Sequence, residues 1–355
     1  MSLKLLNDVK VPVDFNLPKE LGQQELLEDA KLFEKAKNLI KEKKAFFIAH
    51  YYCSPIIQKL CEEVDGFIGD SLEMARKGRD CKEDIVLVAG VRFMGQTAKI
   101  LSPNKTVLMP DLNAECSLDL CCSVEELKKQ KSLHPKATVV AYANTSAEVK
   151  AQSDWIVTSS TAVSLGKYLA SQGQEVLWVP DRHLGSYIAN LSKASVYSWP
   201  GKCIVHASFA AEEIKKVKTS HPKALLLVHP ESPAEVVAIA DYVGSTSQIL
   251  AFAKTSEACE FIIATEQNIF YKLQQACPDK TFIKAPVLCN ESYDRITPAC
   301  PWMELNTLAK LVEALETPQR HEIFVEENLR DAAMKPLERM LSFSDDIKSG
   351  KIKLA

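Results

Sequence analysis

The stretch that decides the fold is AFFIAHYYCSPIIQKLCEEVDGFIGDS, residues 45–71. It opens with an apolar run, continues into a polar cluster that begins at His50, and reaches Ser54-Pro55 before a helical pattern. We expect the Ser54 side chain to cap this helix, because serine oxygens accept free backbone N–H groups and proline at the first helical position loses none. A second apolar run then ends at Asp70-Ser71. This order of strand, helix and strand is typical of an α/β unit with a parallel sheet.

The same order recurs twice further along the chain. The polar clusters begin at His50, Tyr142 and His229, which are 92 and 87 residues apart. Such a period has the size of a domain and exceeds that of a solenoid repeat. Any α/β chain alternates strands with helices, so the alternation alone leaves coincidence open. Serine caps predicted at Ser146 and Ser232-Pro233, second strands that end in hydroxyl residues, and cysteines in phase with the period favour a true repeat.

We therefore expect an α/β fold of three homologous three-layer αβα domains, with parallel sheets around a pseudo-threefold axis. The apolar runs do not alternate with polar residues, which suits parallel strands buried on both faces. The predicted parts are an N-terminal arm and helix at 1–44, α/β domains at 45–130, 131–220 and 221–320, and a C-terminal strand and helix at 321–355 that pack back on the domains.

Composition limits the partners of the chain. Its 355 residues are 46% hydrophobic and 25% charged, which is ordinary for a globular protein. A net charge of −3 without a basic tract argues against nucleic acid or an anionic membrane surface as a partner. The first residues lack a signal-peptide core, and no apolar run approaches membrane-spanning length. We expect a cytoplasmic protein.

Three of the eleven cysteines follow the repeat. The fourth apolar segment of each copy ends on a proline, and Cys116, Cys203 and Cys300 come next, 87 and 97 residues apart. Three thiolates can hold a 4Fe-4S cluster and leave one iron open as a Lewis acid. Taken from the residues alone, scattered structural thiols are the commoner interpretation. The neighbouring pair Cys121-Cys122 also offers alternative ligands.

Polar side chains follow the strands in all three copies, at the edge where open α/β sheets bind ligands. Glu231 is the natural carboxylate base, and His50 or His229 could move protons. A serine or threonine at a strand end is more often a helix cap than a ligand. The candidate side chains are His50, Tyr52, Ser71, Tyr142, Asn144, Ser159, His206, His229, Glu231, Ser245 and Thr246.

Long motifs run in a fixed order along nearly the whole chain. They include His50-Tyr51-Tyr52, Gly69-Asp70-Ser71-Leu72-Glu73-Met74-Ala75, Val88-Ala89-Gly90-Val91-Arg92-Phe93-Met94, Ala114-Glu115-Cys116-Ser117-Leu118-Asp119, Tyr142-Ala143-Asn144-Thr145, Cys203-Ile204-Val205-His206, Val228-His229-Pro230-Glu231-Ser232-Pro233, Gly244-Ser245-Thr246-Ser247-Gln248 and Cys300-Pro301-Trp302-Met303. Together these motifs resemble the quinolinate synthase family, iron-sulfur enzymes of de novo NAD biosynthesis.

The resemblance implies a transferase that condenses iminoaspartate with dihydroxyacetone phosphate to quinolinate and releases phosphate and water. It also implies a functional link to L-aspartate oxidase, and a 4Fe-4S cluster held by Cys116, Cys203 and Cys300 with the fourth iron facing substrate. Glu231, Tyr52 and His50 would then be catalytic. The substrate-binding positions would be His50, Ser71, Tyr142, Ala143, Asn144, Ser159, His206, His229, Pro230, Glu231, Ser245 and Thr246.

The chain departs from its relatives at one motif. Some members carry Cys-x-x-Cys-x-x-Cys before Pro-Trp-Met, whereas this chain has Asp294, Thr297 and Cys300 at those positions. A regulatory disulfide within that triplet is therefore in doubt, although Cys289 offers a different partner. Two rival functions stay open: another open-iron hydro-lyase acting on a small di- or tricarboxylate, and a redox sensor or carrier without turnover.

Overall fold

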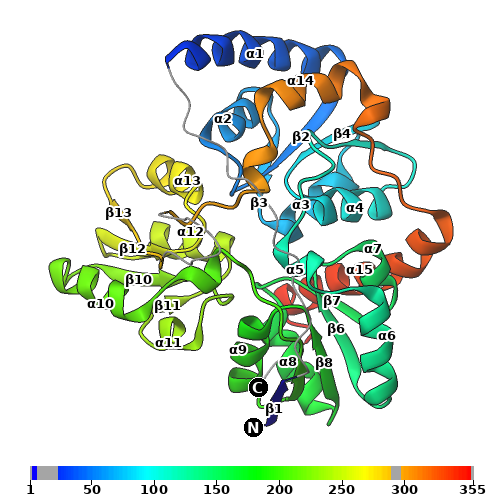
Figure 1. Ribbon diagram of the computed structural model, residues 1–355, viewed down its shortest axis with the longest axis vertical. Helices are drawn as coiled ribbons and strands as arrows, with labels where there is room; N and C mark the ends of the chain where they lie inside the picture. The colour runs from blue at the N-terminus through cyan, green and yellow to red at the C-terminus, as the bar shows by residue number, and fades with distance from the viewer. Residues whose placement is uncertain (1, 6–22, 289–296, 353–355) are drawn as a thin grey trace.

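The computed structural model describes residues 2–5, 23–288 and 297–352. Figure 1 shows three α/β units, one above, one to the left and one below, that meet near the centre of the molecule. Each unit contains a parallel sheet flanked by helices. The expected fold class, three repeated three-layer α/β domains, is confirmed.

The three sheets share one strand order. The first holds β2 (Ala45–His50), β3 (Phe67–Gly69), β4 (Ile85–Ala89) and β5 (Thr106–Leu108) as β3-β2-β4-β5. The second holds β6 (Thr138–Tyr142), β7 (Trp155–Val157), β8 (Glu175–Val179) and β9 (Ser195–Ser198) as β7-β6-β8-β9, with β1 (Ser2–Leu5) added beside β9. The third holds β10 (Leu225–Val228), β11 (Tyr242–Val243), β12 (Glu260–Ala264) and β13 (Thr281–Lys284) as β11-β10-β12-β13. All neighbouring strands are parallel, so the same topology occurs three times.

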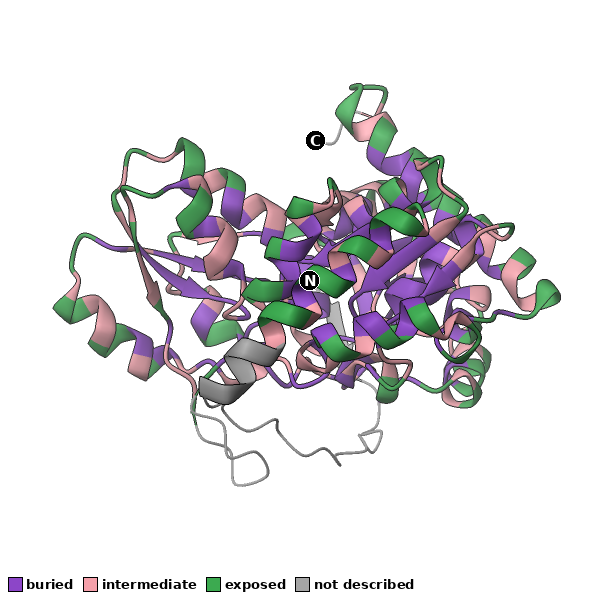
Figure 2. Cartoon of the chain, turned by 90° about the horizontal axis from the view of Figure 1, so that it is seen from above, coloured by how far each residue is buried: buried purple, intermediate pink, exposed green. Residues whose placement is uncertain are grey.

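The central strands lie between two helix layers, which is why their sequences are apolar without alternation. In β4, β6, β8 and β12 every residue after the first is buried. Figure 2 shows buried strands in the interior of the molecule and exposed residues on the outer faces of the helices. The prediction of parallel strands covered on both faces is confirmed.

Helices occupy equivalent places in the three units. The helices that precede the first strand of each sheet are α1 (Gln23–Glu42), α6 (Val124–Leu133) and α10 (Ala211–Ser220). The crossover helices are α2 (Pro55–Glu63), α3 (Ser71–Asp80) and α4 (Arg92–Leu101), then α7 (Ala147–Ala151), α8 (Ala162–Ser171) and α9 (Arg182–Ser192), then α11 (Ala234–Val237), α12 (Thr246–Thr255) and α13 (Ile269–Ala276). Among the helices that the structure describes, none is long and apolar enough to cross a membrane.

The predicted serine caps are correct at one of three helices. The Ser146 hydroxyl accepts the Val149 amide at 3.3 Å and caps α7. At α2, the backbone carbonyl of Ser54 receives the amides of the first turn, and its side chain makes no capping bond. The helix α11 begins one residue later than predicted, with Pro233 at the cap position, so the Ser232 side chain stands outside the first turn.

The terminal segments cross between units. The helix α14 (Leu308–Glu316) packs along α1 over the first unit, and α15 (Glu327–Lys348) packs on α7, β7 and α4. The strand predicted after residue 321 is wrong. This segment forms a single antiparallel bridge, Leu108 with Glu322, because the edge strand β5 that it meets has only three residues. The short helices α5 (Ser117–Leu120), η1 (His206–Ser208), η2 (Met303–Leu305) and η3 (Pro318–Arg320) lie in connections.

Candidate functional site

A central cavity lies where the carboxyl ends of the three sheets meet. The space between its walls is about 680 Å³ when the open mouth is included. Every unit contributes to its wall. The predicted site residues that line it are His50, Tyr52, Ser71, Cys116, Tyr142, Asn144, Ser159, Cys203, His206, His229, Glu231, Thr246 and Cys300.

Three predicted residues do not line this cavity. The Ser245 hydroxyl accepts the Gln248 amide at 3.3 Å and caps α12, which is the alternative that strand-end serines commonly follow. Ala143 turns its carbonyl toward the ammonium group of Lys150, at 2.8 Å. Pro230, between two cavity residues, is buried as well. Ser245 and Ala143 are thus used in hydrogen bonds beside the cavity, and Pro230 is a buried neighbour of two lining residues.

The structure makes Cys116, Cys203 and Cys300 equivalent. In each unit, a backbone amide just beyond the third strand donates to the carbonyl two residues before the cysteine. These bonds are Arg92 N to Ala114 O at 2.6 Å, Arg182 N to Gly201 O at 2.8 Å, and Gln267 N to Pro298 O at 2.9 Å. The same anchor therefore places one thiol from each unit at the cavity.

The neighbouring thiols of Cys121 and Cys122 point elsewhere. The Cys121 sulfur donates to the Leu118 carbonyl at 3.1 Å and packs against Gly201. Cys122 lines a separate hollow of the second and first units. Neither is among the described residues that line the central cavity, so the geometry favours Cys116 over both. Cys289 lies outside the described residues.

The three cavity thiols lie close enough to interact electrostatically in all three pairs. Burial raises the pKa of the Cys116 and Cys203 thiols well above the usual value, and the neighbouring acidic groups and thiols raise it further. Thiols in this state are neutral, and a bound cation would displace their protons. Soft thiolate donors of this kind suit an iron-sulfur cluster.

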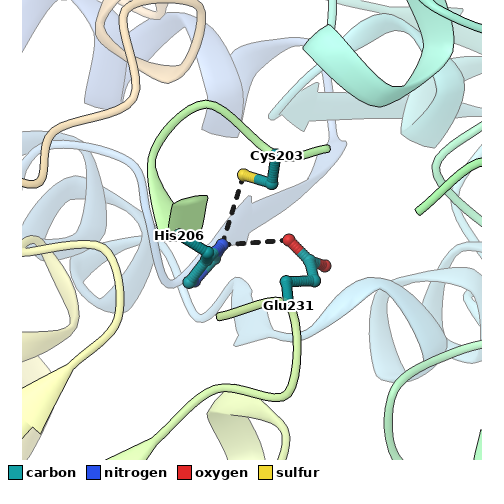
Figure 3. A group of neighbouring side chains, drawn as sticks. All are labelled: Cys203, His206 and Glu231. Carbon is teal, nitrogen blue, oxygen red and sulfur yellow. Dashed lines mark hydrogen bonds and ion pairs between the residues drawn. The ribbon is translucent and has the colours of Figure 1, made fainter. Parts of the chain in front are cut away.

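Glu231 is the centre of a buried hydrogen-bond network. Its Oε1 accepts the Tyr142 hydroxyl at 2.5 Å, and its Oε2 lies 2.9 Å from His206 Nδ1. The same His206 nitrogen lies 3.2 Å from the Cys203 sulfur, as Figure 3 shows. The ligand atoms of Cys203, His206 and Glu231 lie within 4.8 Å of one another, so this trio could also hold a metal ion. The His206 ring therefore links the Glu231 carboxylate to the Cys203 thiol.

The charges at the site follow from burial. Burial alone would raise the pKa of the Glu231 carboxyl, but His206, His229 and the hydrogen bonds from His206 and Tyr142 bring it to about 2. Burial lowers the pKa of His50 to about 3, and that of His229 to about 3 with help from the nearby His206. At neutral pH, Glu231 is therefore ionised while His50 and His229 are neutral hydrogen-bonding groups.

Tyr52 joins the network through a threonine that the sequence motifs did not single out. The Tyr52 hydroxyl lies 2.8 Å from Thr246 Oγ1 and 2.6 Å from Thr265 Oγ1, and Thr265 Oγ1 lies 2.9 Å from His206 Nε2. Burial raises the pKa of Tyr52 well above its usual value, so its phenol stays protonated. A continuous path of hydrogen bonds thus runs from Tyr52 through Thr265 and His206 to Glu231.

Sequence reasoning missed part of the cavity wall. The sequence search considered only the polar residues that follow the first and second strands of each unit. Thr265 and Glu266 directly follow the third strand of their unit, so the same signal applied to third strands would have found them. The apolar wall residues lack a comparable signal, because apolar side chains near strand ends resemble core residues. The missed wall residues are Asp70, Val91, Phe93, Met94, Glu115, Thr158, Val205, Glu266 and Met303.

The family model described as quinolinate synthetase A protein matches residues 34–342, which is most of the chain and includes all three units.

Proposed function

The chain belongs to the quinolinate synthetase A protein family, and on that premise we propose that it condenses iminoaspartate with dihydroxyacetone phosphate to quinolinate, releasing phosphate and water. One observation carries the proposal. Three cysteines in equivalent positions of three repeated units meet at one cavity beside an ionised, buried carboxylate. A chain that used its cysteines only for packing would have no need of this symmetry.

The donor set fits a 4Fe-4S cluster with Cys116, Cys203 and Cys300 as ligands. Three thiols satisfy three irons, and the remaining wall combines apolar side chains with polar ones that could contact a substrate. When bound, the cluster would supply an open iron that acts as a Lewis acid toward the substrate.

The cavity wall also suits anionic substrates. The helices α3 and α12 begin at Ser71 and Thr246, and both residues line the cavity. Helix N-termini carry partial positive charge, which favours carboxylate and phosphate groups. Part of each first turn is already capped, because Asp70 accepts the Leu72 and Glu73 amides and Ser245 accepts the Gln248 amide. The neutral imidazoles of His50 and His229 add hydrogen-bond donors without bringing an unpaired charge into a buried site.

The residues of the chain divide the proton transfers between them. Glu231 accepts a substrate proton at its carboxylate, which lies between Tyr142 and His206. His206 can take that proton at Nδ1 and pass one from Nε2 to Thr265. Tyr52, protonated at neutral pH, then donates from its hydroxyl at the other end of this path. Ser159 bonds to Tyr142 and holds its ring in place.

The proposal extends to the source of the substrate. Imines hydrolyse in water, so we place the chain beside an L-aspartate oxidase that forms iminoaspartate. A reducing cytoplasm is the compartment that we propose, because the described cysteines are all free thiols and such compartments keep thiols reduced.

Five single variants test the cluster assignment. We expect Cys116→Ala, Cys203→Ala and Cys300→Ala to lose both the cluster and quinolinate formation, whereas Cys121→Ala and Cys122→Ala keep both. Anaerobic purification followed by iron and sulfide analysis measures the cluster, and product analysis with both substrates measures turnover. A full cluster in Cys300→Ala would contradict the ligand assignment. Turnover of a single dicarboxylate without dihydroxyacetone phosphate would instead indicate a hydro-lyase.

A further inference from the structure

Two buried carboxylates occupy equivalent positions in the second and third units. Asp181 stands two residues after the end of β8, and Glu266 stands two residues after the end of β12. The exposed fraction of each residue is 0%. Burying a carboxylate is costly unless hydrogen bonds compensate for the lost water, so each of them must have a structural use.

Both carboxylates accept the backbone N–H of the cavity cysteine in their own unit. Asp181 Oδ2 receives the Cys203 amide at 3.3 Å, while its Oδ1 receives the Leu184 amide at 2.6 Å. Glu266 Oε1 receives the Cys300 amide at 3.2 Å, while its Oε2 receives the Asn268 amide at 2.7 Å. In each case one oxygen holds the start of the following helix and the other holds the cysteine.

The first unit uses a different arrangement. Val91 stands two residues after the end of β4, and its side chain offers no acceptor. The Cys116 loop is instead linked to the Cys203 loop, because Ser117 Oγ accepts the Ile204 amide at 3.2 Å. This bond couples the Cys116 loop to the Cys203 loop. The amides of Cys203 and Cys300 are each held by one carboxylate, that of Asp181 and that of Glu266.

We propose that Asp181 and Glu266 are positioning residues that hold Cys203 and Cys300 in the orientation needed to bind the cluster. The inference rests on the proposed function, because it requires that these cysteines are ligands. In each residue, the two oxygens connect the cysteine amide with the start of the following helix, and this pair of hydrogen bonds sets the direction of the cysteine backbone. Outer groups that orient ligands commonly contribute to the affinity for the metal. Glu266 also stands in the cavity wall, whereas Asp181 is not among the described residues that line it. In this scheme the effect of both carboxylates on the cluster passes through the two thiols.

The side-chain chemistry explains why an acid stands at both positions. Both oxygens of each residue accept a backbone amide, and Glu266 Oε1 also accepts the side-chain amide of Asn268 at 3.1 Å. A carboxylate is a side chain with two acceptor oxygens. Asparagine or glutamine would keep the shape and retain one acceptor, but would turn an N–H donor toward the other amide. Asp181→Asn and Glu266→Gln are therefore intermediate variants, between wild type and alanine.

Two aspartates provide matched controls. Asp154 Oδ2 accepts the Val139 amide at 2.8 Å in the second unit, and Asp241 Oδ2 accepts the Leu226 amide at 2.7 Å in the third. Both hold the amino ends of the first strands of their sheets, at the edge opposite the cavity. Asp154→Ala and Asp241→Ala thus remove a carboxylate bond to a backbone amide without touching a cysteine loop. Both aspartates are exposed, and Asp241→Ala also removes an ion pair with Lys218, at 2.6 Å.

The experiment measures how fast the anaerobically purified, full-length protein loses iron to a chelator. We expect release to be roughly tenfold faster in Asp181→Ala and in Glu266→Ala, the order of the factor that the loss of one buried hydrogen bond causes. Asp181→Asn and Glu266→Gln should fall between these variants and the wild type. We also expect the EPR spectrum of the reduced cluster to shift in all four variants, which a purely structural role would not cause.

The outcomes separate this inference from the proposed function. If the wild type holds no 4Fe-4S cluster, the proposed function fails and the inference fails with it. If the wild type holds the cluster but the four variants release iron at its rate, only the positioning role is overturned. Asp154→Ala and Asp241→Ala should lower the melting temperature while iron release stays at the wild-type rate, and equal acceleration in these controls would also overturn it. If either alanine variant does not fold, its amide counterpart decides by the same two measurements.

Discussion

Replacing Glu231 by glutamine removes a negative charge from the cavity and keeps the size of the side chain. The wild-type carboxylate is 3% exposed and lies between the Tyr142 hydroxyl at 2.5 Å and His206 Nδ1 at 2.9 Å. Glutamine can still accept from Tyr142 through its oxygen and can donate to His206 through its nitrogen. We therefore expect Glu231→Gln to fold and to bind the cluster, but to lose its proton acceptor.

The size of the effect follows from the role of the base. A positioned general base typically contributes about 10²–10⁴ in rate, which corresponds to about 3–5 kcal/mol in the activation barrier. We expect kcat to fall by that factor, while KM changes much less because the substrate contacts stay. Because the pKa of Glu231 is held at about 2, the wild-type carboxylate is ionised throughout the neutral range. The ratio of variant to wild-type rates should therefore not vary with pH between about 6 and 8.

The assay is quinolinate formation under anaerobic conditions, with iron and sulfide measured on the same sample. Glu260→Gln is the matched control, because Glu260 forms a similar pair with His221, at 2.6 Å, at the amino end of β12. This control should keep wild-type kcat. A Glu231→Gln enzyme with a full cluster and a kcat within about threefold of wild type would refute the role of Glu231 as base.

Three further substitutions test other parts of the structure. In cluster-free protein, the native pKa of His229 is about 3 against 6.5 unfolded, so the native state resists protonation and stability is lost as pH falls from 6.5 toward 3. His229→Asn should therefore lose about 1.4 kcal/mol less than wild type between pH 7.5 and 5.5 in urea unfolding, and equal losses would contradict this. Gly201→Ala should cost about 1–3 kcal/mol and lower the iron content, because the added Cβ would lie 2.5 Å from the Pro180 carbonyl; a wild-type melting temperature and iron content would show that the loop can shift. Lys150→Met should lower the melting temperature and raise KM, because the buried ammonium group holds the carbonyls of Ala143 and Thr145 beneath the cavity wall; unchanged values of both would exclude that role.

Local sequence patterns were enough to predict the repeated units and most of the cavity wall. Apolar runs that are followed by polar residues mark parallel strands and their carboxyl ends, and both features depend on residues close together in the chain. The period of the cysteines favoured Cys116, Cys203 and Cys300 but left structural thiols and the pair Cys121-Cys122 open, and the resemblance to a known family selected the three. Local patterns were less reliable at the starts of helices, where Ser54 and Ser232 were predicted to cap and their side chains do not. A few residues of sequence do not determine in which direction a serine hydroxyl points.

The sequence by itself therefore determined the three α/β units, their order, and one cysteine and one polar cluster in each. The tertiary structure alone decided that the three strand edges face one cavity, that Ser245 turns away from it, and that Thr265 joins Tyr52 to His206. It also decided the charges, since the pKa values of Glu231 and His229 depend on burial and on side chains from other units. The physical reason is distance along the chain: hydrogen bonding and desolvation at the site join residues about two hundred positions apart, and no local pattern encodes which distant group will be the neighbour.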